Sequence, residues 1–270
     1  MRLAPLVVFV LVLVGCGSAP TPDEVVSDTG TKTADAGTAR IAVGFDGVVE
    51  TSGAFNLEDG TGVLGGDRPH TIIAADAAYE RLSDERAMTP ITSSKRWLKW
   101  EKGALVALVL HPVVDSPADL LAFLGSAREV HEVGSGEERG EPVTRYSAVL
   151  DLERFLAGIP PAERADVRDV LSEIWPGWEA AAPSAQLALD AQGRLRRADL
   201  VLGDGSGELA FEFFGYGVKV DATAPPKDEV VTWAEYEELL RKECESLKKK
   251  GLEKTMPHCV GGCSAGEGEA

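Results

Sequence analysis

Cysteines are the most reactive side chains in this sequence, and three of the four lie close to the C-terminal end. Three residues separate Cys259 from Cys263, and Cys244 precedes both. Thiols so close together pair readily in an oxidising compartment, so we predict a disulfide between two of Cys244, Cys259 and Cys263. His258 beside Cys259 also permits a zinc site of three thiolates and one imidazole. Free or intermolecular thiols are the third possibility.

Motifs of enzymes are missing or out of context. No His-Glu-x-x-His run occurs, and the Gly-rich stretches 203–207 and 261–268 lack the Lys-Ser/Thr pair of a phosphate-binding loop. The segment 262–266 matches Gly-x-Ser-x-Gly, but a nucleophile elbow needs a strand before it and a helix after it. We therefore predict a protein that is not an enzyme and that uses neither a cofactor nor a metal.

Composition limits the possible partners. The chain has 270 residues, of which 44% are hydrophobic and 26% are charged, so a packed core is possible. The net charge of −17 argues against binding to nucleic acid, because contacts with phosphates need a basic surface. It also argues against electrostatic docking on anionic lipid. An attachment to a membrane must therefore use something other than a basic patch.

The N-terminal residues offer such an attachment. Arg2 precedes an almost wholly apolar run from Leu3 to Val14. This run has about 12 residues, against the ~20 that a spanning helix needs, and it is typical of a signal peptide. It ends in Leu-Val-Gly-Cys at Cys16, which resembles the lipobox of bacterial lipoproteins. The resemblance implies cleavage before Cys16 and acylation of this cysteine, and two acyl chains suffice for stable anchoring.

The sequence divides into four segments. Residues 1–15 are the expected signal peptide, and residues 16–39 are expected to form a lipidated flexible tether, because they show no apolar period. Residues 40–231 are expected to form one domain. Residues 232–270 are expected to form a C-terminal helix and a Cys-bearing tail, the helix opening with a Thr232-to-Glu235 capping box.

Apolar periodicity within the domain predicts strands and two helices. The period of two and the turn residues predict strands that follow one another as meanders. These strands are expected near 41–49, 61–64, 70–75, 78–82, 96–100, 104–110, 128–133, 141–152, 185–190, 195–202 and 208–214. The helices are expected at 117–126 and 161–175, where Pro follows a capping residue or apolar residues recur on one stripe.

Several motifs, in this order, resemble a lipoprotein family. They are Leu120-Leu121, the run Arg-Gly-Glu-Pro-Val-Thr-Arg-Tyr at 139–146, the hairpin Leu-Asp-Ala-Gln-Gly-Arg-Leu-Arg-Arg at 189–197, and the strand and exit at 214–226. Together they resemble actinobacterial lipoproteins of the LppX/LprAFG type, relatives of the LolA carrier, over residues 39–231. The resemblance implies an α+β fold, a curved antiparallel half-barrel with helices on its concave face. The polar segment 83–94 and the part after Thr232 depart from the family pattern.

The resemblance also implies a function. In this family an apolar cavity between sheet and helices holds acyl chains, so we expect a lipid or glycolipid ligand and a location on the outer face of the cell membrane. The expected ligand-binding residues are Leu120, Phe123, Leu124, Val167, Leu171 and Ile174. The same residues could instead fill a solid core. The alternative function is an envelope sensor or protein-binding module with the same fold.

Overall fold

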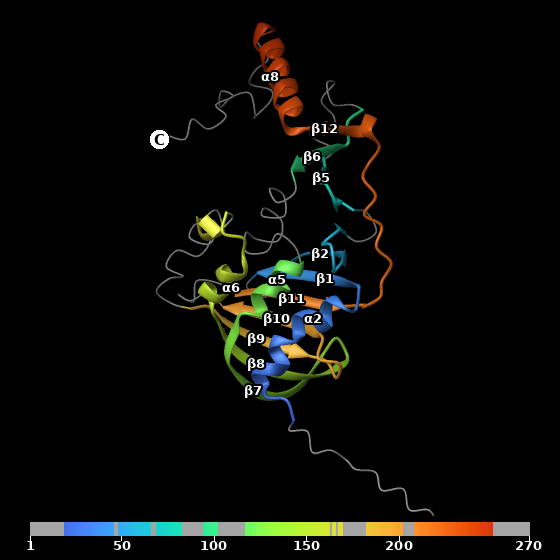
Figure 1. The fold of residues 1–270 in the computed structure, drawn as a ribbon. Helices are drawn as coiled ribbons and strands as arrows, with labels where there is room; N and C mark the ends of the chain where they lie inside the picture. The colour runs from blue at the N-terminus through green and yellow to red at the C-terminus, as the bar shows by residue number, and fades with distance from the viewer. Residues whose placement is uncertain are drawn as a thin grey trace, which may run out of the picture.

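In the part of the chain that the structure describes, twelve strands form one curved sheet, and short helices pack against one face of it (Figure 1). The computed structural model describes residues 19–45, 48–65, 69–82, 94–101, 117–162, 164–165, 167–169, 182–201 and 208–250. The expected fold class, an α+β half-barrel with helices on the concave face of a curved antiparallel sheet, is confirmed.

Two meanders make up the sheet. The first consists of β1 (Thr38–Phe45), β2 (Val48–Asn56), β3 (Gly62–Leu64), β4 (Thr71–Ile73), β5 (Ala77–Arg81) and β6 (Trp97–Glu101). The second consists of β7 (Ala127–Glu138), β8 (Glu141–Leu150), β9 (Ser184–Leu189), β10 (Leu195–Val201) and β11 (Glu208–Phe214). Strand β1 pairs with β11 and so joins the two meanders. All described pairs are antiparallel except that of β12 (Val230–Thr232) with β6.

Local turn chemistry explains the hairpins that the sequence predicts. Between β2 and β3, Asn56 Oδ1 accepts a hydrogen bond from the Glu58 amide at 2.9 Å, and Asp59 Oδ1 accepts one from the Thr61 amide at 2.8 Å. Gly60 then has a φ of 70°, a conformation that glycine adopts without steric cost. These side chains satisfy backbone donors within the turn itself, so the hairpin needs no distant partner.

The hairpin of β7 and β8 is longer than expected. The expected strands 128–133 and 141–152 leave 134–140 as their connection, but β7 continues to Glu138, and only Arg139 and Gly140 form the turn, with φ values of 49° and 83°. Gly136 lies where a Cβ would come within 2.8 Å of the Arg145 guanidinium carbon. Glycines in this strand therefore let an arginine of the next strand lie across the backbone, which a sequence pattern does not reveal.

The prediction of a flexible tether up to residue 39 is wrong for residues 22–34. They form helices α1 (Pro22–Ser27) and α2 (Thr29–Ala34). Thr21 and Glu24 make a capping box at the start of α1, with Glu24 Oε2 2.7 Å from the Thr21 amide nitrogen. Helix α1 packs on β7, and α2 packs on β10 and on α5 (Pro117–Leu124).

Burial holds these two short helices in place. Val26, Thr29 and Thr33 are at most 1% exposed. Thr33 Oγ1 accepts a hydrogen bond of 2.9 Å from the amide of Leu195 in β10. The sequence shows little apolar period here because two of the three buried side chains are threonines.

Other elements were partly anticipated. Helix α8 (Trp233–Lys249) begins with the predicted capping box, in which Glu235 Oε2 accepts a hydrogen bond of 2.9 Å from the Thr232 amide. Helix α6 (Leu152–Gly158), capped by Asp151, replaces the expected end of a strand. Of the predicted helix at 161–175, the structure describes 161–162, which form a turn, and 164–165 and 167–169, which are helical. Three predicted segments lie outside the described residues: the signal peptide with the residues up to 18, the predicted strand at 104–110, and the tail after 250.

The buried residues form one main core and two small ones. The main core joins the helices to strands β1–β4 and β7–β11. The first small core is made by Leu82, Leu98, Val231 and Tyr236, where α8 covers β6 and β12. The second lies around Ala77 and Tyr79. The C-terminal extension of β12 and α8 therefore has a core of its own at the far edge of the sheet.

The hydrogen bond from Leu195 to Thr33 gives a test of the N-terminal helices. In Thr33→Val, the buried amide of Leu195 loses its acceptor, so we expect unfolding free energy to fall by about 1–3 kcal/mol. Denaturant unfolding measures the change. Thr31→Val, at an exposed site on the same helix, is the matched control and should stay close to wild type. Equal stability of Thr33→Val and wild type would show that this segment is not part of the folded domain.

Candidate functional site

The helices that carry the predicted ligand-binding residues lie on the sheet. Leu120, Phe123 and Leu124 of α5 are 1%, 0% and 1% exposed and belong to the main core. Phe123 meets Phe155 of α6 edge to face, with ring centroids 5.1 Å apart. Val167 is half-buried and packs against the same core.

Close contacts hold this helix layer together. Gly30 of α2 lies where a Cβ would come within 3.1 Å of the Leu121 carbonyl oxygen, so α2 and α5 approach backbone to backbone. The structure thus brings Leu120, Phe123, Leu124 and Val167 to one core, whereas Leu171 and Ile174 lie outside the described residues. Their role in ligand binding stays a prediction.

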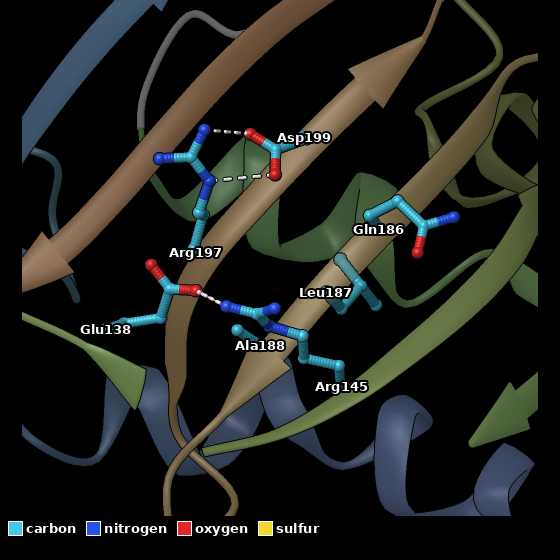
Figure 2. Close-up of a pocket in the computed structure, with 7 residues that line it drawn as sticks. All are labelled: Glu138, Arg145, Gln186, Leu187, Ala188, Arg197 and Asp199. Carbon is cyan, nitrogen blue, oxygen red and sulfur yellow. Dashed lines mark hydrogen bonds and ion pairs between the residues drawn. The ribbon is translucent and has the colours of Figure 1, made fainter. Parts of the chain in front are cut away.

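A polar pocket of about 280 Å³ lies on the outer face of the sheet, opposite the helices (Figure 2). Ala188 of β9 lies in register between Arg145 of β8 and Arg197 of β10. A small residue flanked by two long ones leaves a hollow, and Ala188 forms its floor. Gln186 and Asp199 pair in the next row and close one side.

The charged side chains around this pocket are paired with one another. Arg145 contacts Glu138 at 2.8 Å. Arg197 contacts Asp199 at 2.7 Å and Glu212 at 2.8 Å, as Figure 2 shows for Asp199. The hydrogen bond to Asp199 raises the pKa of Arg197 above its usual value. Because each guanidinium faces a carboxylate, this pocket has little net charge.

The turn of β7 and β8 extends this network to β11. Arg139 contacts Glu212 at 2.6 Å, and its guanidinium carbon lies 4.0 Å from the centroid of the Phe214 ring. Arginines from β8, β10 and this turn thus contact carboxylates of β7, β10 and β11, and the side chains crosslink β7 with β8 and β10 with β11 on this face. We interpret the network as a structural support for the curved sheet.

A second polar cluster fixes the hairpin that the family resemblance singled out. Asp190 accepts hydrogen bonds from the amides of Gln192 and Arg194, both at 3.0 Å, and from Arg194 Nε at 2.9 Å. The Arg194 guanidinium carbon lies 4.5 Å from the centroid of the Tyr216 ring, and the Tyr216 hydroxyl donates to the Leu195 carbonyl. Burial raises the pKa of Tyr216, so its hydroxyl stays protonated. These contacts explain the motif by structure, without a ligand.

Most of the predicted lipidation and disulfide residues lie outside the part of the chain that the structure describes. Cys16, Cys259 and Cys263 are not among the described residues. Cys244 is disulfide-bonded, and its pairing with one of the two C-terminal cysteines stays a prediction. In the described part of the chain, no group of three His, Cys, Asp or Glu side chains is arranged to hold a metal ion. Within the same residues, no helix is both long and apolar enough to span a membrane.

Several solved structures match this chain at low sequence identity. LprF from Mycobacterium bovis matches 76% of this chain and 96% of its own, at 12% identity and a TM-score of 0.47. Lipoprotein LppX from Mycobacterium tuberculosis matches 73% of this chain and 98% of its own, at 15% identity and a TM-score of 0.41. These two are of the lipoprotein type that the sequence resembles.

Another match is MucB. The aligned region covers 78% of this chain and 63% of the MucB chain, at 15% identity and a TM-score of 0.34. A complex of MucB with MucA(peri) also matches. No protein-family model and no curated protein matches the sequence. At such low identities we base the function on the residues of this chain.

Arg197 gives a test of the outer network. Arg197→Met keeps most of the aliphatic stem but leaves Asp199 and Glu212, which are 18% and 21% exposed, without their shared cation. We expect a loss of about 1–3 kcal/mol of unfolding free energy. Arg241→Met is the matched control, because its partners on α8 are well exposed and should contribute little. If both variants unfold at the same denaturant concentration as wild type, the network does not support the sheet.

Proposed function

We propose that this chain is a membrane-anchored lipoprotein whose half-barrel binds the acyl chains of a lipid or glycolipid between sheet and helices. It would carry or present that lipid at the outer face of the cytoplasmic membrane. The observation that carries the proposal is a wide apolar sheet face covered by several short helices.

Simple dimensions explain why this cover suits a lipid. Helix α5 has 8 residues and α6 has 7, so each is about 11–12 Å long. The strands from β2 to β7 across the sheet span about 29 Å at ~4.8 Å per strand. Several separate short segments must therefore cover the apolar face of the sheet. They can move apart with less loss of packing than one continuous helix could. Between these segments, acyl chains from the bilayer stay out of water, where each exposed methylene would cost about 0.8 kcal/mol.

The N-terminal helices α1 and α2 limit the distance between the proposed anchor at Cys16 and the half-barrel. Only residues 17–20 separate Cys16 from the capping residue Thr21 of α1. Four residues span at most about 14 Å when fully extended. With Cys16 acylated, the half-barrel would lie directly against the bilayer, and a lipid would pass from membrane to protein over a short distance.

Anchoring through Cys16 is testable by substitution. In Cys16→Ser, no thioether can form, so we expect the protein in the medium or as an unprocessed precursor. Cell fractionation and intact-mass measurement distinguish these forms from the acylated wild type. A variant that remains processed and firmly membrane-bound would contradict the proposed anchor.

Ligand binding is testable at Val167, the predicted site residue that is half-buried. In Val167→Trp the larger side chain should occupy the space of an acyl chain, so we expect less lipid to co-purify while the thermal midpoint changes little. Mass spectrometry of lipid extracts and thermal unfolding are measured on each variant. Val133→Trp, on an exposed site of β7, is the control.

The two readouts distinguish the two functions. If the interior is a solid core, Val167→Trp overpacks it and costs about 1–3 kcal/mol, which would lower the midpoint by several degrees. A lower midpoint, with no lipid in wild-type protein from its own host, would contradict the proposal. Such a result would favour the protein-binding module.

A further inference from the structure

The C-terminal extension forms one side of a second, open pocket at the edge of the sheet. This pocket has a volume of about 1000 Å³ and lies between β5, β6, β12, the segment 224–227 and the first turns of α8. In Figure 1 this region lies at the end of the molecule away from α2 and β7. The pocket shares no lining residue with the outer pocket of Figure 2.

Four lysines reach this pocket from four different segments. They are Lys95 before β6, Lys99 within β6, Lys227 in a short 3-10 helix, and Lys242 in α8. The whole chain has a net charge of −17, so such convergence is unusual for it. Lysine is a compact point charge with three donors, and several lysines placed around one space suit a small anion with oxygens on several sides.

The acidic residues of the pocket leave part of this positive charge uncompensated. Glu235 accepts hydrogen bonds from the Thr232 amide and hydroxyl, both at 2.9 Å, and so serves as a helix cap. Glu238 is shared between Arg241 at 2.7 Å and Lys242 at 3.2 Å. Hydrogen bonds from these two side chains lower its pKa to about 2.

Two lysines of the pocket, Lys95 and Lys227, form no ion pair with a described carboxylate. Asp76 contacts Lys99 at 3.8 Å, whereas Lys95 interacts with the Glu235 carboxylate only at a longer range. The remaining wall is apolar, with Tyr79, Val230 and Leu239. A cationic rim beside an apolar wall fits a ligand that has both an anionic and an apolar part.

We infer that this pocket binds the phosphate group of an amphipathic molecule. The volume is at the upper end of the range for small-molecule sites, about 300–1,000 Å³. An acidic peptide that adds to the sheet fits less well. Edge strand β12 has only 3 residues and leads directly into α8, so it offers little backbone for a new strand. This inference does not depend on acyl chains in the half-barrel.

The experiment uses the mature chain with Cys16→Ser, so that acylation does not attach it to every vesicle. One arm measures flotation with phosphatidylcholine vesicles with and without phosphatidylglycerol. The other arm measures the binding of glycerol 1-phosphate by calorimetry. Binding to vesicles identifies a lipid head group as the source of the phosphate, and binding of the soluble ester alone identifies a free phosphate ester. Either result supports the site.

A pair of variants locates the binding. Lys95→Gln with Lys227→Gln removes the two lysine charges that form no ion pair with a described carboxylate, and we expect binding to weaken at least tenfold. Lys248→Gln with Lys249→Gln makes the same change of charge at exposed positions near the end of α8 and should alter binding less than twofold. Absence of binding in both arms overturns the inference. So does an equal loss in the two variants, which would show a general effect of charge.

Discussion

The pairing of β1 with β11 is the interaction on which the rest of the structure depends. Each meander is local in sequence, but this pairing joins residues at opposite ends of the domain, with Ile41 opposite Phe213 and Val43 opposite Phe211. These four side chains are all buried on the helix face. Because side chains alternate along a strand, a shift of one residue would move them to the outer face. The register therefore decides where the apolar face and the polar face of the whole sheet lie.

The two faces of the sheet carry different kinds of side chains. The helix face is apolar and covered by short segments, which is why we propose lipid binding there. The outer face carries arginines and carboxylates whose ion pairs connect β7 with β8 and β10 with β11. The structural contacts and the proposed lipid site thus lie on opposite sides of the same strands.

The sequence predicts what local chemistry determines. The Thr232-to-Glu235 box was readable because a helix cap is satisfied by side chains within a few residues. The box of Thr21 and Glu24 has the same form, but helices of 6 residues are too short to show a period. Strand β12 was missed because its 3 residues become a strand only through a partner far away in the chain.

The candidate sites also differ in how far the sequence predicts them. The apolar stripe of α5 predicts burial correctly, but burial alone does not distinguish a core from a cavity wall. The lysine pocket could not be predicted, because Lys95 and Lys227 come together only through the parallel pairing of β12 with β6.

Helix α1 packs on β7 at one edge of the twelve-stranded sheet, and β12 is the other edge. If Cys16 holds the first edge against the bilayer, the lysine pocket faces away from that membrane. A phosphate bound there would then come from a soluble molecule or from a second surface, so the molecule would connect the membrane that anchors it to a ligand beyond.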